Sequence, residues 1–292
     1  MTELRTLLGD WHLALVPVVA LAVVAGGYLW AVRRVNRSCP AQPWPHRRTV
    51  CLLAGLATAA LATLGPPAAL DDEYFSAHMA QHILLTMLAV PLVVLAEPML
   101  LALRASPRET RRRRLVPVYR SRAVHVLTHP VLGWVLFTVV MVGSHVPAVY
   151  DFPLRHPLVH DYVEHPLYVG TALLFFYPLL AATAGTRAVP PAVRLLSLFT
   201  VMAPASVTGF FIYVLPHVAY PFYAHTDRPF GLGALADQQL SGALMWSSSM
   251  IFGVVWVCLA GAYWLRHEAV RTRRADRVGA AALAAEKPGW ST

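Results

Sequence analysis

Two histidines one helical turn apart are the first candidates for chemistry in this chain of 292 residues. His78 and His82 are four positions apart, so on a helix their imidazoles lie on the same face. Imidazoles placed in this way can share one metal ion, as the two histidines of zinc-protease helices do. The alternative is coincidence, because such a pair also arises by chance. The spacing alone therefore leaves both interpretations open.

The segment from His160 to His165 is the second concentration of possible metal donors. If it is helical, Asp161 lies one turn from His165 and His160 lies one turn from Glu164, so each carboxylate could orient an imidazole. His160 and His165 would diverge by about 140° on an α-helix and would not chelate as a simple pair. Pro166 also disfavours helical geometry at His165. The alternative is a polar helix entrance whose side chains bind water.

Three further residues could complete such a site. His145 ends an apolar segment and could face the same cluster. Asp237 opens the last apolar segment, where it is most simply an N-cap, and it could instead support or supply a ligand. Met245 could place a thioether below the histidines, although methionine in an apolar helix usually serves packing.

The composition indicates which elements must position these residues. Hydrophobic residues make up 57% of the chain and charged residues only 13%, whereas a soluble domain needs about a quarter of its residues charged. A helix crosses the hydrocarbon core with about 20 apolar residues, and seven segments meet or approach that length. We therefore predict an all-α bundle of seven transmembrane helices over residues 1–266, followed by a basic, poorly ordered cytoplasmic tail over 267–292. The predicted spans are Trp11–Val32, Thr49–Leu64, Phe75–Leu103, Pro130–Val146, Pro166–Ala184, Val193–Leu215 and Leu240–Leu265.

The basic residues predict the orientation of the bundle. Of the 24 lysines and arginines, 21 fall in cytoplasmic loops or the tail if the N-terminus lies outside. They form short blocks between apolar runs, which is typical of membrane loops and argues against nucleic acid as the partner. Glu97, near the inner end of the third span, either has a function or pairs with an arginine. Nine of the 13 histidines then share the outer depth, namely His12, His78, His82, His145, His156, His160, His165, His217 and His225.

The order of these motifs resembles the seven-helix CtaG-type family of bacterial cytochrome c oxidase assembly proteins. The resemblance covers about residues 50–265 and implies a non-enzymatic factor of the bacterial plasma membrane that helps oxidase maturation by handling copper. Its partners would then be the lipid bilayer and the oxidase subunits that carry copper centres. The motifs are His78-Met79-Ala80-Gln81-His82, Pro91-Leu92, Glu97-Pro98, His145-Val146-Pro147, His160-Asp161-Tyr162-Val163-Glu164-His165, Asp237-Gln238-Gln239 and Met245-Trp246.

Two other functions stay open on the residues alone. Three histidines with an open position could activate water on zinc, with Glu164 or Asp161 as the base, although the sequence His-Glu-x-x-His does not occur. Histidines of facing helices could also bind haem, although haem ligands usually lie deeper in a span. Without a thiolate, imidazole ligands do not choose between copper and zinc. The candidate ligands are His78, His82, His145, His160 and His165, with Asp161, Glu164, Asp237 and Met245 as supporting or additional ligands.

Overall fold

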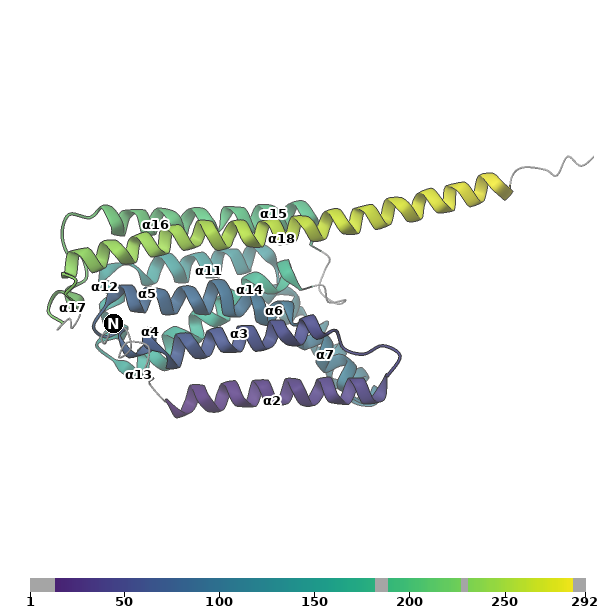
Figure 1. The fold of residues 1–292 in the computed structure, drawn as a ribbon, viewed down its shortest axis with the longest axis horizontal. Coiled ribbons are helices and arrows are strands. Elements are labelled where there is room, and N and C mark those ends of the chain that lie inside the picture. The colour runs from purple at the N-terminus through teal and green to yellow at the C-terminus, as the bar shows by residue number, and fades with distance from the viewer. Residues whose placement is uncertain (1–13, 182–188, 227–230, 286–292) are drawn as a thin grey trace, which may run out of the picture.

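The computed structural model describes residues 14–181, 189–226 and 231–285, and these residues form helices and connecting turns without strands. The long helices lie side by side along one axis (Figure 1). The elements are α2 (Leu15–Ser38), α3 (His46–Leu64), α4 (Pro66–Ala69), α5 (Phe75–Ile83), η1 (Leu84–Ala89), α6 (Val90–Leu95), α7 (Pro98–Ala105), α8 (Arg108–Thr110), η2 (Arg111–Leu115), α9 (Val116–Tyr119), α10 (Arg122–Leu127), α11 (Pro130–Ser144), α12 (Pro147–Leu154), α13 (Pro157–Val159), η3 (His160–Glu164), α14 (His165–Leu180), α15 (Pro191–Thr200), α16 (Met202–Val214), α17 (Pro221–Ala224) and α18 (Ala234–Ala285).

Five helical segments of the described chain are long and apolar enough to cross a membrane. They are Leu15–Ser38, His46–Ala69, Phe75–Ala105, Pro191–Val214 and Ala234–Arg266. A sixth is formed if Pro130–Ser144 and Pro147–Leu154, which meet at 81°, are counted as one span. The predicted span Pro166–Ala184 corresponds to α14, which has 16 residues, and its last three residues lie outside the described ranges. The all-α membrane architecture is therefore confirmed, whereas the count of seven helices and the orientation stay predictions.

The two ends of the bundle differ in their side chains. The histidine end holds α4, α12, α13, α17 and the start of α5, and the arginine end holds α7 and the connection from α2 to α3 (Figure 1). At the arginine end, the buried Trp44 indole donates to the hydroxyl of Tyr28 at 2.9 Å and lies 4.8 Å from the guanidinium of Arg48. The carboxylate of Glu97 lies 4.0 Å from Arg48. Glu97 is thus paired with an arginine, which was one of its two predicted roles.

Three π-helical turns interrupt the helices of the described chain, and each ends two residues before a proline. The hydrogen bonds that close η1, η2 and η3 are donated by the backbone N–H groups of Val90, Val116 and His165. The residues that follow them are Pro91, Pro117 and Pro166. A proline inside a helix lacks an N–H group, and its ring collides with the carbonyl four residues earlier. The wider i→i+5 turn relieves this conflict, so the prolines account for these three wide turns, although Pro153 and Pro178 lie inside α12 and α14 without one.

Glycines allow the last two long helices to approach closely. α16 and α18 cross at Gly209 and Gly242, where a Cβ atom on Gly242 would lie 2.5 Å from the backbone nitrogen of Tyr213 and 2.6 Å from the carbonyl oxygen of Gly209. Small residues at such crossings are common in membrane bundles. The largest apolar core of the described residues lies between α6, α11, α14, α15 and α18, and it contains Phe137, Phe175 and Phe176. This packing fixes α18 beside the helices that carry the histidines.

α18 continues beyond the bundle as far as Ala285 (Figure 1). The segment after Arg266 projects away from the arginine end. The sequence predicted a poorly ordered tail over 267–292, and it did not predict this helical extension. Residues 286–292 lie outside the described ranges.

Candidate metal centre

An aspartate from α18 holds the start of α5, the helix that carries His78 and His82. The carboxylate of the fully buried Asp237 accepts hydrogen bonds from the backbone nitrogens of Phe75 and Ser76 at 2.7 and 3.2 Å and from Ser76 Oγ at 2.5 Å. The first N–H groups of a helix have no partners within it, and a negative charge there also interacts well with the helix dipole. Asp237 therefore caps α5 from a distance of 162 residues along the chain. It lies inside the first turn of α18, so the prediction that it caps its own helix was wrong.

His78 and His82 lie side by side in the interior of the histidine end. Their rings stack with centroids 4.3 Å apart, as the predicted shared face requires. Their exposed fractions are 1% and 4%, and neither ring nitrogen of either residue has a hydrogen-bond partner among the described residues. An unpaired buried polar atom costs about 1–3 kcal/mol, and such atoms are rare in proteins unless an ion or water satisfies them. The two rings are thus suited to a ligand that accepts electron pairs from nitrogen.

A carboxylate from η3 lies beside this histidine pair. Glu164 Oε1 is 3.9 Å from His78 Nε2 and 3.8 Å from His82 Nε2. All three residues are buried, and their donor atoms lie within 4.8 Å of one another. A metal ion with bonds of about 2.0–2.2 Å to imidazole and carboxylate could reach all three after small side-chain movements. We call His78, His82 and Glu164 the inner donor group.

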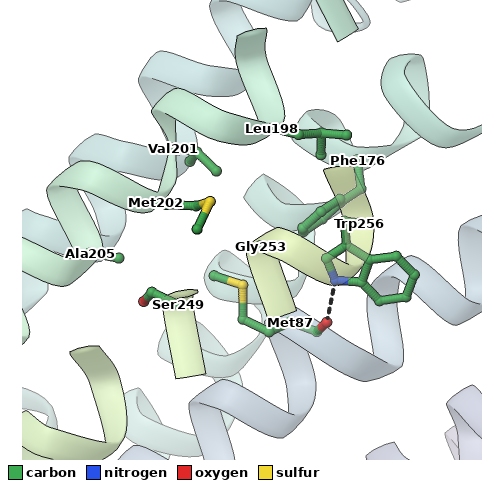
Figure 2. Close-up of a pocket in the computed structure, with 9 residues that line it drawn as sticks. All are labelled: Met87, Phe176, Leu198, Val201, Met202, Ala205, Ser249, Gly253 and Trp256. Carbon is green, nitrogen blue, oxygen red and sulfur yellow. Dashed lines mark hydrogen bonds between the residues drawn. The ribbon is translucent and has the colours of Figure 1, made fainter. Parts of the chain in front are cut away.

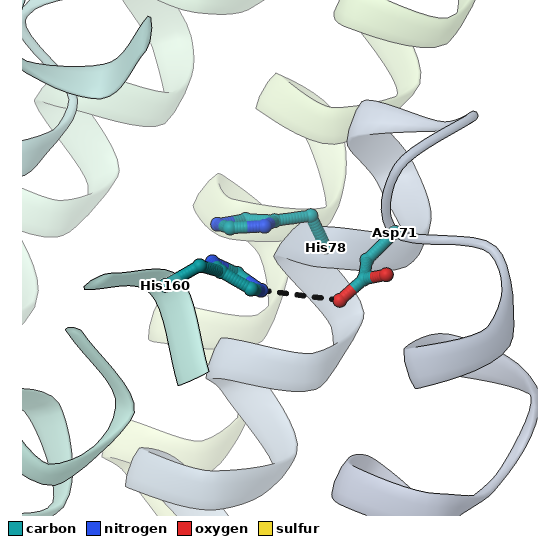
Figure 3. Close-up of side chains that lie close together, drawn as sticks. All are labelled: Asp71, His78 and His160. Atoms are coloured by element: carbon teal, nitrogen blue, oxygen red, sulfur yellow. Dashed lines mark hydrogen bonds and ion pairs between the residues drawn. The ribbon is translucent and has the colours of Figure 1, made fainter. Parts of the chain in front are cut away.

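A second set of donors overlaps the first and includes Asp71, His78 and His160, whose donor atoms also lie within 4.8 Å of one another (Figure 3). We call this set the outer donor group. His160 connects the two groups, because its Nδ1 is 2.9 Å from Glu164 Oε2 and its Nε2 is 3.2 Å from Asp71 Oδ2. The predicted pairing of His160 with Glu164 is confirmed. Burial alone would lower the pKa of His160, but its hydrogen bonds to the two carboxylates and their negative charges raise this pKa to about 10. A metal ion therefore has to displace a proton from His160 in order to bind it.

The π turn η3 brings His160 and His165 together. Their ring centroids are 4.6 Å apart, and the ring of His165 lies 5.5 Å from that of His82. The predicted divergence was wrong because it assumed α-helical periodicity, whereas the hydrogen bond from His165 N to His160 O places residues five apart above one another. The expectation that Pro166 disfavours helical geometry at His165 was also wrong, since φ and ψ of His165 are −58° and −48°. His165 Nε2 has no hydrogen-bond partner in the described chain.

The other predicted site residues have contacts of their own. His145 is buried, and its Nδ1 lies 2.5 Å from the carbonyl oxygen of Met141. Met245 is buried in an apolar cluster of aromatic and methionine side chains. The side chain of Asp161 and the whole of His12 lie outside the described residues. Whether any of these binds metal stays a prediction.

Asp71 and two tyrosines were not among the predicted site residues. The hydroxyl of Tyr223 donates to the carbonyl of Asp71 at 2.7 Å, and that of Tyr220 donates to the carbonyl of His145 at 2.9 Å. The Phe75 ring packs against both tyrosines, with centroids 4.5 Å from Tyr220 and 5.4 Å from Tyr223. This aromatic layer fixes the turn before α5 and the end of α11. In the sequence, only the acidic run at residues 71–73 pointed to Asp71. A turn lies between Asp71 and α5, so the helical spacing that relates His78 to His82 does not extend to Asp71.

The fold and the site together define a polytopic all-α membrane protein with a buried histidine–carboxylate cluster at one end of the bundle. Residues 26–267 match the family described as cytochrome c oxidase caa3 assembly factor, Caa3_CtaG. The chain belongs to this family of oxidase assembly factors, which confirms the resemblance seen in the sequence motifs. The matched region includes both donor groups.

Mycobacterial proteins are also similar to this chain. An uncharacterized protein of Mycobacterium leprae is 29% identical over 275 residues, which is 88% of this chain and 40% of the relative. Uncharacterized proteins of Mycobacterium bovis and Mycobacterium tuberculosis are each 28% identical over 268 residues, which is 89% of this chain and 39% of the relative. The chain thus spans about 40% of the length of the curated relatives that it matches. No solved structure matches the chain.

Proposed function

We propose that this protein binds copper ions at the histidine end of its bundle and delivers them to cytochrome c oxidase subunits during assembly. The observation that carries the proposal is the pair of buried rings of His78 and His82, whose four nitrogen atoms lack hydrogen-bond partners among the described residues. Copper is the cargo in this proposal, and the protein is a non-enzymatic chaperone of the bacterial plasma membrane. The predicted orientation places the histidine end on the extracytoplasmic side, where oxidase copper centres are assembled.

The donor chemistry supports an ion that accepts imidazole. Cuprous, cupric and zinc ions all bind imidazole, and a carboxylate adds affinity for the divalent ions. The preference for copper over zinc comes from the oxidase family, because the inner donor group alone fits both metals.

The arrangement favours holding an ion over hydrolysis. A hydrolase needs a carboxylate that is free to take a proton from metal-bound water. Glu164 is instead hydrogen-bonded to His160 at 2.9 Å and lies near both rings of the inner donor group. We therefore assign Glu164 a role in binding the ion and orienting His160.

The test is the copper content of purified protein in which His78 or His82 is replaced by alanine. Loss of one ligand should lower copper affinity at least about tenfold, since even the loss of a residue that only orients a ligand costs 10- to 100-fold. His46→Ala is the matched control, because His46 is exposed at the arginine end. Zinc analysis and the visible spectrum of the same samples distinguish copper from zinc and haem.

The same variants should reduce cytochrome c oxidase activity in copper-limited cells while the oxidase polypeptides are still made. His46→Ala should leave this activity unchanged. If His78→Ala and His82→Ala proteins keep full copper content and full oxidase activity, the histidines form only a polar helix end, and the proposal fails.

A further inference from the structure

A small cavity lies deeper in the bundle than the histidines, between η1, α14, α15, α16 and α18. Figure 2 shows the thioether side chains of Met87 and Met202 lining this cavity together with Ser249 and Gly253. The volume open to a water-sized occupant is about 10 Å³, which is close to the least that a single water molecule needs. The cavity therefore suits one atom-sized occupant and excludes an organic ligand.

Gly253 provides the space that Met202 occupies. A Cβ atom at Gly253 would lie 2.5 Å from both Cγ and Sδ of Met202, and 2.9 Å from its Cε. The thioether of Met202 thus lies directly against the backbone of α18, where any larger residue at position 253 would displace it.

Met87 is also held in place from α18. It lies in the π turn η1, and its carbonyl oxygen accepts a hydrogen bond from Trp256 Nε1 at 3.0 Å (Figure 2). π turns are frequent at functional sites because they re-aim side chains. The indole at Trp256 fixes the backbone of the turn, so the side chain of Met87 enters the cavity from a constrained position.

We infer that Met87 and Met202 form a second position for copper, selective for the cuprous ion. Thioethers are soft, neutral ligands that select Cu(I) over zinc and cupric ions. A monovalent ion also loses less hydration energy than a divalent ion when it enters an apolar interior. The inference rests on the proposed function, because the copper would arrive from the inner donor group. His82 and Met87 are five residues apart on the continuous helix of α5 and η1, which is about 7 Å along its axis.

This second position differs in chemistry from the inner donor group. Imidazole and carboxylate accept several metals, whereas a thioether pair without a carboxylate rejects zinc. Passage from the first position to the second would thus select copper after a less selective capture. The ion moves as Cu(I) throughout, so the transfer requires no electron donor or acceptor.

The experiment is X-ray absorption at the copper edge on purified full-length protein loaded with Cu(I) under reducing conditions. The variants are Met87→Leu and Met202→Leu, which keep the volume of the side chain and are well tolerated in cores. Met250→Leu is the matched control, because Met250 lies on α18 and faces outward with 49% of its surface exposed. Copper–sulfur scattering should be present in wild type and Met250→Leu, and it should be lost in both cavity variants.

Other outcomes overturn the inference and separate it from the proposed function. If copper in the wild-type protein is bound through nitrogen and oxygen alone, the inferred thioether site is wrong, whereas the proposed histidine site is still supported. Sulfur scattering that persists in both leucine variants would overturn the inference and assign the ligand to another sulfur, either another methionine or one of the free cysteines Cys39, Cys51 and Cys258. If wild type binds no copper, the proposed function and the inference fail together. His78→Ala and His82→Ala proteins loaded directly with excess Cu(I) should keep the sulfur scattering, since the thioether pair is separate from the histidines.

Discussion

Replacing Asp237 by alanine should destabilise the protein and disturb the histidine pair, because this carboxylate joins α18 to the start of α5. It accepts three hydrogen bonds, two from backbone nitrogens and one from Ser76 Oγ. All three partners are donors, so only an acceptor without its own proton satisfies them. With alanine at position 237, these donors lose their acceptor. Water cannot easily replace it, because Asp237 is buried with an exposed fraction of 0%.

The size of the effect follows from the number of bonds. A hydrogen bond to a charged acceptor contributes about 1.5–3 kcal/mol. Because the three bonds share one carboxylate and do not add independently, we take the low value for each and expect a loss of about 4–5 kcal/mol. In chains of about 150–250 residues each kcal/mol lowers Tm by about 2–4 °C. The Asp237→Ala protein should therefore melt roughly 8–20 °C below wild type.

The assay is thermal unfolding of the purified protein in detergent, followed by copper content below the melting temperature. Asp276→Ala is the control, since Asp276 lies on the same helix and is exposed, and surface substitutions of this kind stay within about 0.5 kcal/mol. Asp237→Asn should fall between wild type and alanine, because its amide keeps one acceptor oxygen and turns a donor toward another donor. A melting temperature of Asp237→Ala within about 2 °C of wild type would mean that the cap contributes less than about 1 kcal/mol, and the reasoning would be refuted.

Two further predictions concern the membrane bundle. Gly242→Ala should cost at least about 1–3 kcal/mol of stability, because the added Cβ atom would meet the backbone of α16 at Gly209 and force the helices apart. Gly170→Ala is the control. Its Cβ atom would meet nothing within 4 Å, so this variant should be neutral in the same melting assay. A reporter that is active only outside the cytoplasm should be active when fused after Leu70 and inactive when fused after Arg112 or at the C-terminus. An active C-terminal fusion would contradict the predicted orientation or the predicted number of spans.

The membrane class and the central pair could be predicted from the sequence because both depend on local patterns. Apolar runs of about 20 residues have few interpretations, and a spacing of four positions on a helix fixes the shared face of His78 and His82. The stacked rings in the structure need no other information. The pairing of His160 with Glu164 was accessible for the same reason.

Contacts between distant segments could not be predicted in this way. Asp237 follows the pattern of a local helix cap, and nothing in its neighbourhood indicates a partner 162 residues away. Asp71 lies in a turn, so no helical period relates it to His78 or His160. Each of these contacts depends on how α5, η3 and α18 pack, and that packing is decided by shape rather than by spacing.

The π turns are a third case, because each is accompanied by a local sequence feature, a proline two residues after the turn. Each is followed by a proline within a helical run, although Pro153 and Pro178 lie inside helices without a π turn. Two of the three π turns lie where candidate donors gather. η3 turns His160 and His165 to the same side as Glu164, and η1 carries Met87. A regular α-helix would separate residues five apart by well over 90°, so His160 and His165 could not both face the pair on α5. Pro166 is therefore part of the reason that four histidines converge, although it carries no donor atom itself. When donors are matched near a proline that directly follows a histidine, as Pro166 follows His165, π-helical spacing should therefore be compared with α-helical spacing.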